Sequence, residues 1–226
     1  MPESAHTPVA ESLFFDLDGT LTDPRDGITR CLRYALDGVQ VPAPTDAELT
    51  RWIGPPLHDS FRDFLGPSRR HLVARAVSLY RERFGTVGMF ENSVYPGVPE
   101  GLRLLVESGR RLFVVTSKPT HFARPILQHF DLSRFFVGVY GSELSGERSD
   151  KGELISHVLR TEGLESNDAL MIGDRAHDVR GARQNQVRAI GALWGYGGRE
   201  ELSDAGANDL YASVSELVAA LLAASS

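Results

Sequence analysis

The stretch FFDLDGTLTD, residues 14–23, combines the end of an apolar run with two carboxylates. The Phe-rich run that begins at Ser12 predicts a buried strand. Asp16 and Asp18 are two residues apart, so their side chains emerge on the same side of an extended chain. Gly19 allows the backbone to turn sharply beside them. The stretch therefore predicts a strand whose carboxyl end carries an acidic pair able to hold a cation.

Working outward from this strand, apolar runs alternate with segments of helical spacing. Further strands are expected from Arg111, Phe135, Ala169 and Arg188, and helices over 98–108, 119–130, 151–161 and 177–184. This alternation is typical of a doubly wound parallel sheet with helices on both faces. The fold class expected is α/β, a Rossmann-like core, with the apolar run 217–224 as a final helix packed on the sheet.

Residues 24–92 interrupt the alternation because they contain helical patterns and no convincing strand. The patterns cover 28–36, 46–52, 57–65 and 69–84, and the segments PAP, GPP and GPS separate them. Pro and Gly lie where helices should stop. We therefore expect two domains, namely an α/β core of residues 1–23 and 93–226 and an inserted all-helical cap of residues 24–92.

Composition limits the partners and the compartment. The 226 residues are 42% hydrophobic and 24% charged, which excludes wholesale disorder. A net charge of −6 disfavours a nucleic acid polymer or an anionic membrane as partner. The single cysteine, Cys31, excludes an internal disulfide and is expected to pack inside the cap. The first ten residues show no signal-peptide pattern, so a cytoplasmic protein that spans no membrane is expected.

Polar residues follow the other predicted strands as well. Asp174 ends the strand from residue 169, and Asp178 comes four residues later. Thr116 and Ser117 end the strand from residue 111, and Lys151 begins a helix. Because the carboxyl ends of parallel strands meet at one edge, these groups should face one another. Converging acids need a hard cation such as Mg²⁺, whereas the hydroxyls and the lysine suit a phosphate.

Acids beside anion donors suit the transfer of a phosphoryl group to a carboxylate. Mg²⁺ between the two would cancel their repulsion and let the carboxylate attack phosphorus. The acid two residues further on would protonate the leaving alkoxide and then deprotonate the attacking water. The sequence thus predicts an aspartyl-phosphate intermediate.

Four segments resemble, in order, the motifs of the haloacid dehalogenase superfamily of phosphohydrolases. They are FFDLDGTLTD, VVTSK, DKGEL and MIGDRAHDV. The helical insert and the YPGV segment at 95–98 resemble the capped subclass that includes phosphoglycolate phosphatases, and the resemblance covers about residues 12–222. It implies a Mg²⁺-dependent phosphatase of a small phosphorylated metabolite. Whether the chain is a monomer or a homodimer stays open.

The resemblance implies a role for each motif residue. Asp16 would be the nucleophile, Asp18 the general acid and base, Thr116 a phosphate donor and Lys151 the charge neutraliser. The expected metal ligands are Asp16, Asp18, Asp174 and Asp178. The expected substrate-binding residues are Gly19, Arg51, Thr116, Ser117, Lys118 and Lys151.

Phosphoglycolate is the favoured substrate, and a 5′-nucleotide is the main alternative. Some nucleotidases of the superfamily share the RWIGPPL segment at 51–57 and the SKP segment at 117–119. A nucleotide would need a cap surface that stacks a base, for which Trp52 is the candidate. Asp18 disfavours a dehalogenase, and the lack of lysine in 24–92 disfavours a phosphonatase. A sugar phosphomutase and a non-catalytic binding module stay open.

The sequence allows two interpretations of several side chains. Arg30 and Arg33 either bind a second anionic group of the substrate or form a solvated helix face. Arg51 and His58 flank a loop that either closes over the site or is a solvated turn. His177 is expected to orient the backbone rather than to ligate a metal.

Overall fold

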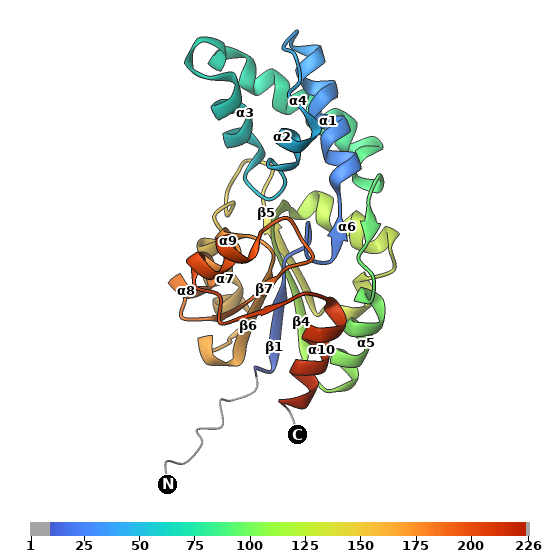
Figure 1. Cartoon of the computed structure of the whole chain (residues 1–226), viewed down its shortest axis with the longest axis vertical. Coiled ribbons are helices and arrows are strands. Elements are labelled where there is room, and N and C mark those ends of the chain that lie inside the picture. Colours follow the sequence, from blue (N-terminus) through green and yellow to red (C-terminus); the bar gives the residue numbers. More distant parts are fainter. Residues whose placement is uncertain (1–9, 225–226) are drawn as a thin grey trace.

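The computed structural model describes residues 10–224; the first nine residues, for which no signal peptide is expected, and residues 225–226 lie outside the described part. A six-stranded sheet forms the centre, with strands in the order β5-β4-β1-β6-β7-β8 (Figure 1). The strands are β1 (Ser12–Phe15), β4 (Arg111–Pro119), β5 (Gly138–Ser142), β6 (Ala169–Gly173), β7 (Arg188–Ala192) and β8 (Asp209–Tyr211). All neighbours run parallel, and β1 pairs with both β4 and β6. The predicted doubly wound α/β fold is confirmed.

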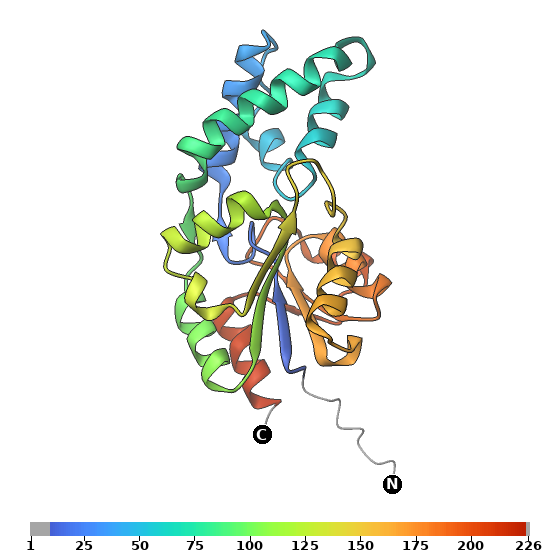
Figure 2. The same cartoon turned by 180° about the vertical axis from the view of Figure 1, so that it is seen from behind.

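Alternation along β1 creates two separate apolar clusters, because successive side chains point to opposite faces. Leu13 and Phe15 belong to one cluster and Phe14 to the other. The first face is covered by α5 (Val98–Glu107), α6 (Thr120–His129) and α10 (Val214–Ala223), and the second by α7 (Lys151–Glu162), α8 (Ala176–Gln184) and α9 (Arg199–Ala205). Figure 2 shows the two helical layers from behind. The sheet is thus buried on both faces, which explains its continuous apolar runs.

A group of helices lies beyond the carboxyl ends of the strands (Figure 1). It contains α1 (Arg25–Gly38), α2 (Asp46–Thr50), α3 (Leu57–Leu65) and α4 (Val73–Thr86), with 3₁₀ turns at Pro67–Leu72 and Gly88–Phe90. Helix α1 packs against α4, and their apolar faces bury Leu32, Leu36 and Phe84. The antiparallel strands β2 (Thr22–Asp23) and β3 (Ser93–Val94) connect this group to the sheet.

Some elements differ from the sequence-based expectation. Strand β8 and helix α9 were not expected, because three and seven residues are too short to give a clear period. Strand β5 begins at Gly138 rather than at Phe135, since the chain first makes a 3₁₀ turn over Ser133–Phe135. The final helix is present as expected. No helix within residues 10–224 is long and apolar enough to cross a membrane.

Candidate active site

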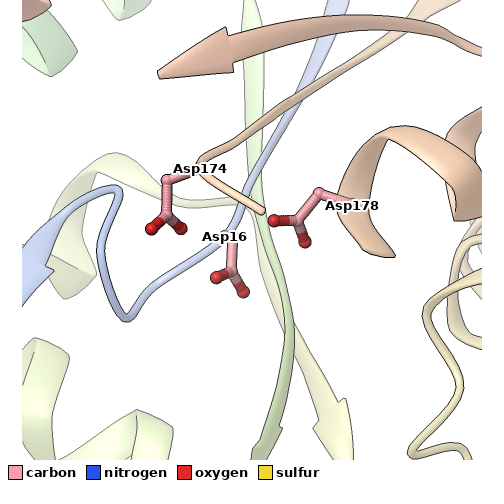
Figure 3. A group of neighbouring side chains, drawn as sticks. All are labelled: Asp16, Asp174 and Asp178. Atoms are coloured by element: carbon pink, nitrogen blue, oxygen red, sulfur yellow. The ribbon is translucent and has the colours of Figure 1, made fainter. Parts of the chain in front are cut away.

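Three buried acids converge at the carboxyl edge of the sheet. Asp16 follows β1, Asp174 follows the neighbouring β6, and Asp178 lies in the first turn of α8. One carboxylate oxygen from each lies within 4.8 Å of the others. Figure 3 shows the three side chains close together at this edge. The parallel pairing of β1 with β6 therefore brings together acids that are about 160 residues apart in the sequence.

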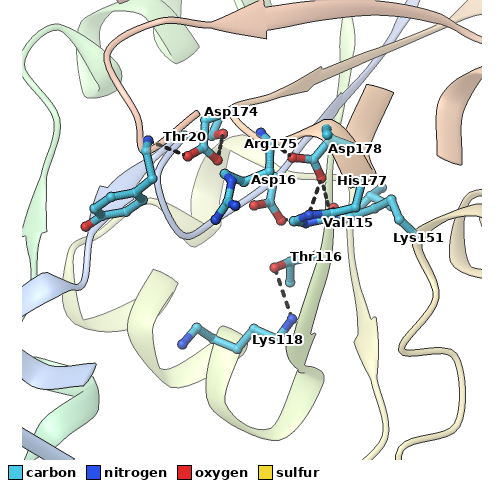
Figure 4. A network of polar contacts seen from close by, with 12 residues as sticks. Asp16, Thr20, Val115, Thr116, Lys118, Lys151, Asp174, Arg175, His177 and Asp178 are labelled. Atoms are coloured by element: carbon cyan, nitrogen blue, oxygen red, sulfur yellow. Dashed lines mark hydrogen bonds and ion pairs between the residues drawn. The ribbon is translucent and has the colours of Figure 1, made fainter. Parts of the chain in front are cut away.

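Lys151, the first residue of α7, lies among these acids and is also buried. Its Nζ is 2.9 Å from Asp16 Oδ1 and 2.7 Å from Asp178 Oδ1, and it donates to the Val115 carbonyl at 2.9 Å (Figure 4). Burial favours the neutral amine, but the two carboxylates outweigh it and raise the pKa of Lys151 above its ordinary value. The lysine thus supplies a fixed positive charge.

One ammonium group does not balance three acids. Burial, Asp178 and Asp16 raise the pKa of Asp174 well above its ordinary value of 3.8. Burial likewise raises the pKa of Asp16. Burial also acts to raise the pKa of Asp178, but Lys151, His177 and the Arg175 amide together outweigh it and lower this pKa. Burial is the largest cause of both raised pKa values, and the three acids share the single ammonium group of Lys151. A cluster of buried carboxylate oxygens with excess charge fits a hard divalent cation such as Mg²⁺.

The Asp18 side chain lies outside this acidic group, and its role as a metal ligand stays a prediction. Its Oδ2 is 2.8 Å from Lys118 Nζ instead. The chain turns at Gly19, whose φ is +87°, so Asp18 faces the cleft rather than the other acids. Its buried Oδ1 has no hydrogen-bond partner among residues 10–224. An unpaired oxygen in this position is available to exchange a proton with a substrate.

The end of β4 supplies the polar groups opposite Asp16. Thr116 Oγ1 accepts a hydrogen bond from the Lys118 amide at 3.2 Å, and Ser142 Oγ donates to the Ser117 carbonyl at 2.8 Å. Thr116, Ser117 and Lys118 all line the cleft. The ammonium of Lys118 lies 4.3 Å from the ring centre of Phe84 in α4. The structure therefore brings residues of the first, second and fourth motifs together around one cleft, and Lys151 of the third motif pairs with Asp16 beside it.

Three expected substrate-binding residues, Gly19, Arg51 and Lys151, do not line the cleft. At Gly19 a Cβ atom would come within 2.2 Å of Asp174 Oδ2, so this glycine permits the turn to pack on Asp174. Arg51 follows α2 and is exposed, whereas the next residue, Trp52, lines the cleft. Substrate binding by these three residues stays a prediction.

The charged cap residues for which the sequence allows two interpretations also lie outside the cleft. Arg30 pairs with Glu91 at 2.8 Å, and Arg33 pairs with Asp46 at 2.5 Å, so both bind acids of the helical group. The His58 side chain is 66% exposed. None of the three lines the cleft. In this structure all three residues therefore lie away from the cleft.

A cleft of about 90 Å³ lies between the sheet edge and the helices. Its two walls differ in chemistry. The sheet side contributes Asp16, Asp18, Thr116, Ser117, Lys118 and His177. The helical side contributes Ile28, Leu32, Trp52, Gly54, Pro55, Pro56, Leu57 and Tyr80. None of these described cap residues carries a charge.

Comparison with known proteins then identifies the family. Residues 13–192 match the family described as haloacid dehalogenase-like hydrolase. The chain belongs to this family. A 5′-nucleotidase of Pseudomonas aeruginosa is 49% identical to this chain over 191 residues, which are 84% of this chain and 86% of the relative. Phosphoglycolate phosphatase 1 of the same organism is 28% identical over 84% of this chain and 72% of its own length.

A solved structure supports the same assignment. The crystal structure of a predicted phosphatase from Clostridium acetobutylicum is 40% identical and superimposes with a TM-score of 0.91, covering 96% of this chain and 100% of the other. The predicted family and fold are thus confirmed. This haloacid dehalogenase-like hydrolase is a phosphatase, that is, a phosphoric monoester hydrolase.

Some residues at the active site could not be predicted from the sequence pattern. Ile28, Leu32 and Tyr80 line the cleft, but their apolar helical spacing is that of ordinary core residues. Arg175 was not singled out, although it lies between Asp174 and Asp178 in the fourth motif. The only available signal was its position in GDRAHD.

Proposed function

We propose that this phosphatase hydrolyses nucleoside 5′-monophosphates with Mg²⁺ as cofactor. The observation that carries the proposal is the uncharged, apolar cap wall opposite the buried acids. Phosphoglycolate would place its second anionic group, a carboxylate, against this wall, and burying an unpaired charge is costly. A nucleoside presents a ring face instead, which suits an apolar and aromatic surface.

Trp52 is the strongest candidate for contact with the base. It lines the cleft, and its ring packs edge-on against Phe61 and at a tilt against Phe64, both with centroids 5.3 Å away. These contacts hold the indole in place before any substrate binds, which limits the entropy cost of stacking. The 49% identical 5′-nucleotidase supports the same substrate class. Phosphoglycolate, favoured on the sequence, stays a prediction supported by more distant relatives.

The catalytic roles follow from the geometry. Asp16 is the proposed nucleophile, since its carboxylate lines the cleft and pairs with Lys151 Nζ at 2.9 Å. Asp18, with one free buried oxygen, protonates the leaving 5′-oxygen and then takes a proton from water. Thr116 and Ser117 offer their hydroxyl groups to the phosphate at the end of β4 that leads into α6.

Metal binding is proposed for the acidic group. Asp16, Asp174 and Asp178 would hold Mg²⁺, which when bound neutralises the phosphate charge that otherwise repels Asp16. Thr20 and the Tyr196 amide donate to Asp174 at 3.3 Å and 2.8 Å and so orient this ligand. We further propose that residues 24–92 act as one cap domain over the core.

The test is phosphate release from AMP, CMP, phosphoglycolate and glucose 6-phosphate, each with Mg²⁺ or with EDTA. We expect the highest kcat/KM for a nucleotide and no release in EDTA. A higher kcat/KM for phosphoglycolate would overturn the nucleotide proposal and restore the prediction made from the sequence. Undiminished release in EDTA would overturn the metal assignment.

A further inference from the structure

Arg175 connects the acidic edge of the core to the loop of the cap that lines the cleft. It lies between Asp174 and Asp178, and its Nη1 donates to the Ile53 carbonyl of the cap at 2.5 Å. Its Nε donates to Glu201 Oε1 in α9 at 2.9 Å. The side chain is only 17% exposed. A guanidinium held at both ends in this way has little freedom to move.

The loop that Arg175 holds is the one expected to contact the leaving group. Ile53 is buried, and its neighbours Trp52 and Gly54 both line the cleft. At Gly54, where φ is +105°, a Cβ atom would lie 3.3 Å from the Arg175 side chain and 3.2 Å from His177. The cap backbone therefore rests directly on the fourth motif.

The backbone of Arg175 takes part in the acidic group as well. Its amide donates to Asp178 Oδ2 at 3.1 Å. Glu201 Oε1 accepts from both the Arg175 side chain and the Ala176 amide, which fixes the first turn of α8. One residue thus contacts an acid of the proposed metal site through its main chain and the cap through its side chain.

We propose that Arg175 is a positioning residue that keeps the cap loop 52–57 closed on the acidic edge, so that the nucleoside part of the substrate is bound only while this bridge exists. The inference rests on the proposed function for the nature of the leaving group. It predicts an effect that depends on the size of the leaving group. A substrate that does not reach the cap needs no bridge, whereas a nucleotide does.

The kinetic test compares Arg175→Met with the natural sequence on AMP and on acetyl phosphate. Methionine keeps most of the side-chain length but removes the donors. We expect the KM for AMP to rise about tenfold with kcat changed less than twofold, and kcat/KM for acetyl phosphate to stay within twofold. Arg175→Lys, whose single amine can reach one partner at a time, should give a KM for AMP between those of the natural sequence and of Arg175→Met. Equal losses on both substrates would show a purely structural role and overturn the inference.

The matched control is Arg33→Met, which removes an arginine that pairs with Asp46 inside the cap. We expect this variant to leave the KM and kcat for AMP and for acetyl phosphate unchanged. If Arg175→Met does not fold, as judged by circular dichroism, Arg175→Lys carries the kinetic test alone. In that case, an unchanged KM for AMP in Arg175→Lys would overturn the inference.

A second measurement does not depend on the substrate. Nitroxide labels on Ser68→Cys in the cap and Asn167→Cys in the core report their separation by pulsed electron paramagnetic resonance; both positions are exposed, and the natural Cys31 is buried. Arg175→Met or, if that variant does not fold, Arg175→Lys should broaden and shift the distance distribution, and Arg33→Met should not. An unchanged distribution would overturn the inference even if AMP is a substrate. If AMP is not hydrolysed, the proposed function fails while this measurement still decides the role of Arg175.

Discussion

The two walls of the cleft are built on different physical principles. On the core wall, Lys151 and Asp16 form an ion pair whose side chains are 1% and 4% exposed, so each charge depends on a specific partner. On the cap wall, residues such as Leu57 and Pro55 offer apolar contact, which has no preferred direction. The difference suggests that changes in the core abolish the reaction, whereas changes in the cap alter which substrate is accepted.

The largest effect is expected for Asp16→Asn. An amide is a poor nucleophile, so phosphate release from any substrate should fall by about 10⁴-fold or more. Asp37→Asn, at an exposed position of α1, is the control and should be neutral. Steady-state kinetics and circular dichroism check the result. Activity within tenfold of the natural sequence would remove Asp16 from the role of nucleophile.

Next in size is the loss of stability in Lys151→Met. The change leaves Asp16 and Asp178 buried without their cation, so the free energy of unfolding in EDTA should fall by about 3–5 kcal/mol. Mg²⁺ should restore part of the loss. The control Arg103→Met removes an exposed pair with Glu100, and about 0–1 kcal/mol is expected. Urea unfolding measures both, and equal losses would contradict the contrast between buried and exposed charge.

The contribution of Asp174 to the stability of the metal-free protein should fall as pH rises above 3.8. Burial and the neighbouring acids raise the pKa of Asp174, so above 3.8 the folded state retains a proton that the unfolded state has released. This contribution is complete below pH 3.8 and disappears as pH passes the raised pKa. Urea midpoints from pH 4 to 8 in EDTA measure it. Asp174→Asn should flatten the slope relative to the natural sequence, and identical slopes would argue against the assignment.

A smaller effect is expected from a cation placed on the cap wall. Leu57→Arg adds a charge at a partly buried position of the cleft. The ratio of kcat/KM for phosphoglycolate to that for AMP should rise about tenfold, or about 1.4 kcal/mol, because the arginine can pair with the carboxylate. Leu57→Gln controls for lost apolar contact. No change in the ratio would mean that the cap wall does not select the substrate.

The smallest effect is expected for Arg51→Ala. Since Arg51 is exposed and does not line the cleft, kcat/KM for AMP should change by less than twofold. Trp52→Ala, one residue away, should raise the KM for AMP several-fold. A large effect of Arg51→Ala would show that the loop turns over in solution and would support the prediction from the sequence.

The sequence predicted the core more completely than the cap, for physical reasons. Asp16 and Asp174 follow apolar runs, and the rule that parallel strand ends meet at one edge was enough to place them together. Tyr80 and Leu32 gave no such signal, because an apolar residue that lines a cleft has the same spacing as one in a core. The bond between Arg175 and Ile53 joins residues 122 apart and depends on how the two parts pack. The pairing of Asp18 with Lys118 is likewise tertiary, and the sequence pattern did not predict it.

The short ribbon of β2 and β3 has a consequence for how such chains diversify. The cap leaves the core and returns to it on paired strands, with Asp23 opposite Ser93. A two-residue hairpin turn would be long enough to join these positions. The insert therefore enters and leaves the core at neighbouring positions, so its length can vary without re-routing the sheet. Its exchange is limited by packing, because the insert and one face of the sheet share a single apolar cluster that includes the contact between Phe84 and Phe122.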